Sequence, residues 1–155
     1  MKEYVKAVLH QLEVANDSIL KIIDTINEVE IDEEILEKKR TVRQILSHIA
    51  LIYKADFFIM SGASKVEMDR FYESSTPHSL LEIKEALVEN FQFLYTNISR
   101  FSEEDFLTPM TSWWGVTYTK YEWLIEIVGH VYHHRGQLHT ILIAKGHEIK
   151  VPLFE

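Results

Sequence analysis

Four stretches of the sequence repeat apolar residues at the three- and four-residue spacing of an amphipathic helix. They cover roughly residues 2–27, 41–60, 79–99 and 119–145. In the first stretch the series is Val5, Leu9, Leu12, Ile19, Ile22, Ile23 and Ile26. No segment sustains the apolar–polar alternation of a strand. Four long helices in a chain of 155 residues predict one all-α domain, residues 1–155, folded as a four-helix bundle.

Short signals mark where these helices begin and end. Thr41 is a candidate N-cap for the second helix, and Ser79 with Glu82 three residues later is a candidate capping box for the third. Gly146 follows the last apolar position of the fourth helix, where a glycine commonly ends a helix.

The connections between the predicted helices are long. The segment "EVEIDEEILEKKR", residues 28–40, is charged and predicted to be solvated, with Ile31, Ile35 and Leu36 available to dock on the core. Residues 61–78 and 100–118 form the other two connections. A crossover as long as 61–78 can travel the length of a bundle, so it permits a topology other than simple up-down-up-down.

Composition excludes several classes of protein. A net charge of −8 argues against nucleic-acid binding, which requires a basic face. The chain has no cysteine, so it has neither disulfides nor thiolate metal ligands. The N-terminal residues mix apolar with charged side chains, unlike a signal peptide, and no apolar run is long enough to span a membrane. We therefore expect a soluble, cytoplasmic protein.

Histidines gather in the fourth predicted helix, where "GHVYHHRGQLHTIL", residues 129–142, contains four of the chain's eight. His130 and His134 are one turn apart and about 40° apart around the helix, so two imidazoles can reach one ion. His130 and His133 are a second possible pair. The apolar stripe favours the first pair and leaves His133 and His139 at its flank: it runs through Trp123, Ile127, His130, His134, Leu138 and Ile141.

A third histidine lies at the centre of the apolar face of the second predicted helix. His48 belongs to the series Thr41, Ile45, His48, Ile52, Ala55 and Ile59. One interpretation is that these inward histidines are simply buried and satisfied by hydrogen bonds, since an unpartnered polar ring in a core is costly. The other is that His48, His130 and His134 converge on Zn²⁺ or Ni²⁺ and leave a coordination position open for water or substrate.

Other residues are weaker candidates for the same site. Glu126 and Gln137 extend the histidine stripe by one turn on either side, and each either orients an imidazole or metal-bound water or lies at the solvated end of the stripe. Asn16 lies near the inward face of the first helix and is a candidate for lining the pocket. Arg135 is predicted to point away from the core and to pair with an acidic neighbour. Two tryptophans in the loop "SWWG" either flank the mouth of the pocket or cover the end of the core: Trp113 and Trp114.

The segments "RTVRQILSHIALIYKADFF" and "TKYEWLIEIVGHVYHHRGQLHTIL" resemble the DinB/YfiT-like superfamily of bacterial metalloenzymes, over essentially the whole chain. The specific part of the resemblance is "HVYHHRGQL", which matches the H-x-x-x-H-R-G-Q pattern of that family. The resemblance implies an up-down-down-up four-helix bundle, often a homodimer, and a divalent metal held by His48, His130 and His134.

Known relatives include thiol-dependent S-transferases that use bacillithiol or related thiols, so the resemblance implies a thiol S-transferase of detoxification or stress response. Its partners would be a low-molecular-weight thiol and a small-molecule electrophile. The catalytic group would be a metal-bound thiolate or water, with no nucleophile from the protein. A metal-dependent hydrolase and a non-catalytic metal- or ligand-binding stress protein are the alternatives.

Overall fold

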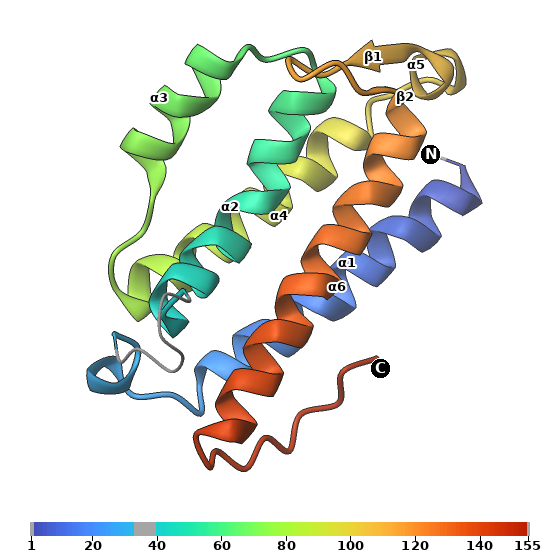
Figure 1. Ribbon diagram of the computed structural model, residues 1–155. Coiled ribbons are helices and arrows are strands. Elements are labelled where there is room, and N and C mark those ends of the chain that lie inside the picture. Colours follow the sequence, from blue (N-terminus) through green and yellow to red (C-terminus); the bar gives the residue numbers. More distant parts are fainter. Residues whose placement is uncertain (1, 33–39, 155) are drawn as a thin grey trace.

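Four long helices form the framework of the protein, as the periodicity predicted. The computed structural model describes residues 2–32 and 40–154. The framework helices are α1 (Glu3–Ile23), α2 (Val42–Met60), α4 (Leu80–Ile98) and α6 (Lys120–Ala144) (Figure 1). Each begins and ends close to the predicted boundary, except that α1 stops at Ile23 instead of residue 27. The prediction of a four-helix bundle is confirmed.

The predicted capping residues lie at the helix termini: Thr41 and Ser79 begin helices, and Gly146 follows the end of one. The hydroxyl of Thr41 accepts a hydrogen bond from the backbone N–H of Gln44, and Ser79 does the same for Glu82. The carboxylate of Glu82 accepts from the backbone N–H of His78 and not from that of Ser79. Gly146, at φ +90°, adopts the left-handed conformation that terminates α6.

The helices follow an up-down-down-up order. In Figure 1, α2 and α4 run in one direction, whereas α1 and α6 run in the other. Each helix packs against one parallel and one antiparallel neighbour: α2 contacts α4 and α6, and α1 contacts the same two helices. Because α2 and α4 are parallel neighbours, the chain must return along the 19 residues of α2, about 28 Å, before α4 begins. This requirement explains the long crossover.

The connections contain more regular structure than predicted. The crossover carries α3 (Lys65–Ser75), whose first turn is capped by Ser64. The connection between α4 and α6 contains α5 (Glu103–Leu107) and an antiparallel hairpin of β1 (Pro109–Thr111) and β2 (Thr117–Thr119). A 3₁₀ turn, η1, covers Glu28–Glu30. Strands of three residues are too short to show alternation in a sequence, which is why the hairpin was missed.

The core lies between the four framework helices. All seven apolar residues of the predicted α1 series are buried. Ile31 is also buried, so the charged connection docks on the core there, whereas Ile35 and Leu36 lie outside the described residues. No helix in the described part of the chain combines the length and hydropathy needed to cross a membrane.

Arg135 was predicted to point away from the core, and this prediction is wrong. Its side chain is only 3% exposed, and it donates hydrogen bonds to Ser18 Oγ and to the carbonyl oxygen of Leu153. The guanidinium also lies 4.3 Å from the ring centroid of Tyr132 and 5.1 Å from that of Phe154. Arg135 therefore fastens the C-terminal segment to α6 and α1, and its partners are carbonyl, hydroxyl and aromatic groups where an acidic side chain was expected.

Candidate metal centre

Three imidazoles from two neighbouring helices converge at one point. His48 of α2 approaches His130 and His134 of α6, with 3.1 Å between its Nε2 atom and each of theirs. One nitrogen from each ring lies within 4.8 Å of the other two. All three side chains are partly buried. The structure thus brings together the three histidines that the two apolar stripes selected, in an arrangement that could hold a metal ion.

The outer nitrogens of the two α6 histidines are held by hydrogen bonds. His130 Nδ1 lies 2.8 Å from Asp56 Oδ2, and His134 Nδ1 lies 2.8 Å from Gln137 Oε1. A carboxylate or amide oxygen can only accept, so both Nδ1 atoms carry the proton. In a neutral imidazole the Nε2 atom then has a free lone pair, and both lone pairs point toward His48.

This donor set fits a cation. With both α6 lone pairs facing the centre, at most one of them can be satisfied by a proton from His48 Nε2. The lone pairs of the nitrogens otherwise repel one another, with 3.1 Å between His48 Nε2 and each of the other two. Convergent imidazole nitrogens with their outer N–H groups fixed by oxygen acceptors are the arrangement found around protein-bound transition metals. The residues present therefore suit a divalent metal ion.

The surroundings change the pKa of each of the three imidazoles in a different way. Burial, together with the neighbouring His134 and His130, lowers the pKa of His48 to about 3. Burial also lowers the pKa of His134. For His130 burial acts in the same direction, but the hydrogen bond and charge of Asp56 outweigh it, so the pKa is raised. His48 and His134 are consequently neutral at physiological pH, which is the form that binds a metal.

Asp56 is the site residue that the sequence reasoning missed. It lies two turns after His48 on α2, and its side chain is only 14% exposed. The available signal was a single carboxylate inside the apolar run "LIYKADFFIM", which the stripe did not include. Asp56 takes the role considered for Glu126, since it is Asp56 that bonds His130. The predicted neighbour Gln137 does contact an imidazole, that of His134, and its amide also lies 3.0 Å from His133 Nε2.

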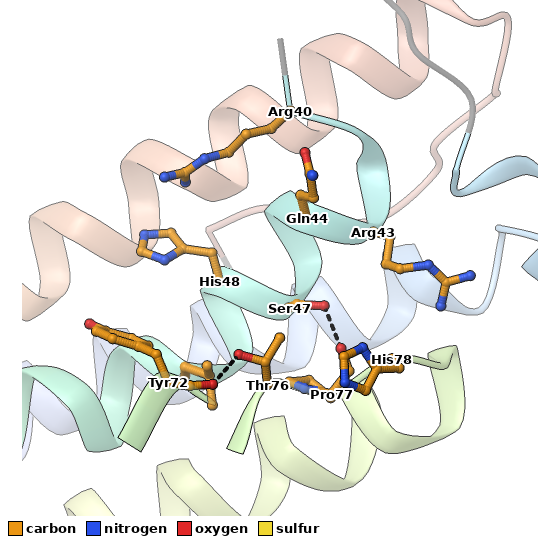
Figure 2. Close-up of a pocket in the computed structure, with 10 residues that line it drawn as sticks. Arg40, Arg43, Gln44, Ser47, His48, Tyr72, Thr76, Pro77 and His78 are labelled. Atoms are coloured by element: carbon orange, nitrogen blue, oxygen red, sulfur yellow. Dashed lines mark hydrogen bonds between the residues drawn. The ribbon is translucent and has the colours of Figure 1, made fainter. Parts of the chain in front are cut away.

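Two cavities adjoin the histidines. The larger, about 440 Å³, lies between α2 and the end of the crossover and is lined by His48, Arg40, Arg43 and Tyr72, among others (Figure 2). The smaller, about 280 Å³, is lined by His130, Asp56 and Glu126. Tyr72 of α3 lines both, and burial raises its pKa to about 12, so its phenol stays protonated.

The smaller cavity contains the tryptophans of the "SWWG" loop. Trp113 and Trp114 line it together with Trp123, and they are 41% and 49% exposed. Burial raises the pKa of Glu126 in the same cavity, and the charge of Asp56 adds to the effect. Asn16, in contrast, lines neither cavity: it is buried in α1, and its Oδ1 atom has no hydrogen-bond partner among the described residues.

Asp56→Ala is expected to weaken metal binding by about 10- to 100-fold, because the Nδ1–H of His130 loses the acceptor that fixes the ring. Competition with a chromophoric zinc chelator measures the affinity. Asp69→Ala is a suitable control, since Asp69 is an exposed carboxylate of α3 paired with Lys65. Equal affinities for wild type and Asp56→Ala would show that Asp56 does not position the site.

Comparison with known proteins places these features in context. The sequence model of the DinB family matches residues 1–151. Among solved structures, a protein assigned to the DinB family from Exiguobacterium sibiricum is 30% identical, with 99% of each chain covered and a TM-score of 0.87. A DinB-like protein from Bacillus cereus is 17% identical, with 96% of this chain and 97% of that chain covered and a TM-score of 0.75.

A further similar structure is that of YfiT from Bacillus subtilis. It is 15% identical, with 96% of this chain and 91% of that chain covered and a TM-score of 0.70. YfiT is described as a probable metal-dependent hydrolase with an unusual four-helix bundle topology. No curated protein matches this chain.

Proposed function

Because the chain belongs to the DinB family, we propose that it is a metal-dependent enzyme whose divalent ion, Zn²⁺ or Ni²⁺, is held by His48, His130 and His134. Imidazole nitrogens suit both metals, and the chain has no cysteine to supply a thiolate ligand. The observation that supports the site is the convergence of three Nε2 atoms, two of them with their lone pairs directed inward by Asp56 and Gln137.

We further propose that the reaction is the transfer of a low-molecular-weight thiol to a small electrophile, in detoxification or stress response. The supporting observation is that two cavities adjoin the histidines, with His48 lining one and His130 the other. A transfer reaction needs room for two substrates at one centre, whereas hydrolysis needs room for one substrate and a water.

The chemistry can be assigned to groups around the centre. When bound, the metal supplies positive charge that lowers the pKa of a thiol at the centre. The thiol gives up its proton, its sulfur forms a bond to an electrophilic carbon, and that carbon releases its leaving group with the bonding electrons. Trp113, Trp114 and Trp123 provide an apolar wall for the electrophile, and the Glu126 carboxylate in the same cavity can take up the proton.

Hydrolysis is the second candidate, and Glu126 favours it. A carboxyl group with a raised pKa beside a metal centre is suited to act as a general base toward water. YfiT, which shares the fold at 15% identity, is described as a probable metal-dependent hydrolase. The expected homodimer and the cytoplasmic location stay predictions.

The two candidates predict different assays. Protein loaded with Zn²⁺ or Ni²⁺ is expected to consume bacillithiol or cysteine in the presence of monochlorobimane at least about tenfold faster than metal-free protein. The fluorescence of the bimane adduct reports the rate, and His48→Ala is the matched inactive variant. Metal-dependent hydrolysis of an activated ester without any thiol would instead favour the hydrolase. If metal-loaded protein shows neither activity, the remaining candidate is a non-catalytic binding protein.

A further inference from the structure

The two arginines of the larger cavity differ in how their charges are matched. Arg43 is bonded to Asp32, at 2.6 Å and 2.8 Å, and also lies 3.4 Å from Glu28. Arg40 has no hydrogen bond or ion pair with any residue in the ranges 2–32 and 40–154. At the edge of this cavity Arg40 therefore presents a guanidinium with no partner among the described residues, next to an arginine that is already neutralised.

Among the residues that the structure describes, no carboxylate lines the larger cavity. Its ionisable side chains are Arg40, Arg43, His48, His78 and Tyr72. This is unusual for a chain with 24 acidic and 16 basic residues, and it contrasts with the smaller cavity, where Asp56 and Glu126 are exposed to the same space as the tryptophans. The larger cavity is thus the one part of the described site whose charge favours an anion.

Two hydroxyls on the remaining wall are already committed to the protein. The Ser47 hydroxyl donates to the carbonyl oxygen of Pro77, and that of Thr76 donates to the carbonyl oxygen of Tyr72 (Figure 2). The Ser47 bond fixes the end of the crossover against α2, whereas the Thr76 bond lies within the crossover. Because Arg43 is already paired with Asp32 and Glu28, Arg40 is the arginine of this cavity that is available to an anion.

Arg40 is also close to the metal centre. Figure 2 shows its side chain and the His48 imidazole extending to the same side of α2. After burial and the neighbouring imidazoles, the charge of Arg40 contributes to the lowered pKa of His48 and acts in the same direction on His134. One small molecule could contact the guanidinium and the centre of the three histidines together.

We propose that Arg40 binds an anionic group of the substrate, a carboxylate or a phosphate, and that this contact places the reacting end of the same molecule at the three histidines. A guanidinium suits this role because its planar N–H groups match carboxylate and phosphate oxygens in pairs. The identity of the reacting end as a thiol rests on the function proposed above, but the anion contact does not. The substrate class is therefore a small acid whose metal-binding atom lies a few bonds from its charged group.

A pair of thiols that differ only in charge tests the proposal. Protein substituted with Co²⁺ is titrated with 3-mercaptopropionate and with 3-mercapto-1-propanol, and the thiolate-to-cobalt absorption band gives each Kd. We expect the acid to bind about tenfold more tightly than the alcohol, as is typical of a hydrogen bond between charged groups. Raising the salt concentration should reduce the preference, because Arg40 is exposed at the rim.

Variants assign this preference to one residue. Arg40→Gln should reduce the acid-to-alcohol ratio to within about threefold of unity, and Arg40→Lys should retain part of it. Arg100→Gln, which removes an exposed arginine in the connection after α4, is the control and should leave the ratio unchanged. Arg40 contacts no described partner, so its substitution is not expected to unfold the protein, and bound cobalt verifies the centre in each variant.

The outcomes separate this inference from the proposed function. If both thiols bind wild type equally, or if Arg40→Gln keeps the preference, the role of Arg40 is overturned while thiol binding stands. If neither thiol changes the cobalt spectrum, the thiol reaction is overturned, and calorimetric titration with inorganic phosphate decides the inference. Phosphate binding that is lost in Arg40→Gln supports it, and phosphate binding that is absent or independent of Arg40 overturns it.

Discussion

His48→Ala, His130→Ala and His134→Ala are each expected to weaken metal binding by more than about 100-fold, more than the loss of a residue that only orients a ligand. Each substitution removes one of three converging nitrogens and leaves a two-nitrogen site. The measurement is metal content by elemental analysis after dialysis, together with affinity from chelator competition. All three variants should keep the helical circular dichroism of the wild type.

His139→Ala and His133→Ala are the matched controls, because both are histidines of α6 outside the convergent group. His139→Ala should have no effect on metal content. His133→Ala should reduce metal content slightly at most. Any such effect would be transmitted through Gln137, whose amide contacts both His133 and His134. Wild-type metal content in any of the three principal variants would remove that histidine from the site.

Removing the metal is expected to destabilise the protein by about 4 kcal/mol at pH 7.5, if free metal is held at a thousand times Kd. A ligand that binds only the folded chain stabilises it by RT ln(1 + [L]/Kd), which gives this value. Protons compete with the metal for the imidazoles, so the increment should shrink as the pH falls toward about 5. Thermal and denaturant unfolding of loaded and metal-free protein across this range measure it.

The metal-free protein should also lose stability on acidification, from a lower starting value. The pKa values of His48 and His134 are lowered in the folded state, so the unfolded chain takes up protons first as the pH falls below about 6.5. For His48 this loss continues down to about pH 3. The pKa of His130 is raised, so its contribution has the opposite sign: it is present below about pH 6.5 and is lost as the pH rises.

Coincident unfolding curves at pH 7.5, for samples shown to differ in metal content, would mean that the three histidines do not form an internal metal site. A metal-free protein whose stability rises as the pH falls toward about 6.5, and then stays level at lower pH, would show that the His130–Asp56 pair dominates over His48 and His134. Asp56→Ala distinguishes this case, since it removes the contact that raises the pKa of His130.

The framework helices and the inward direction of the three histidines follow from local sequence patterns. Periodicity reports the direction in which each side chain leaves its own helix, and this is sufficient to place His48 on the inner face of α2 and His130 and His134 on that of α6. Caps are equally local, which is why Thr41, Ser79 and Gly146 marked helix ends correctly. The metal-ligand role of the histidines itself stays a proposal.

Contacts between helices were beyond the reach of the sequence. Arg135 was expected to face away from the core because it lies about 100° from His134, but α6 packs against both α1 and α2, so its inner surface is wider than one stripe. Asp56 was overlooked because its partner, His130, is 74 positions away in the chain. Angle around a helix axis is a local quantity, whereas the choice of neighbour depends on how helices pack.

Arg40 and Arg43 also differ only through contacts between distant segments. Both are basic residues at the start of α2, and nothing in the local sequence tells them apart. The sequence by itself determined the four helices, their inner faces and the histidines on them, because these depend on 3.6-residue periodicity alone. Only the tertiary structure decided that Asp32 and Glu28 neutralise Arg43, that Asp56 fixes His130, and that two cavities of different charge adjoin one centre. Those features depend on distances between segments that the fold alone brings together.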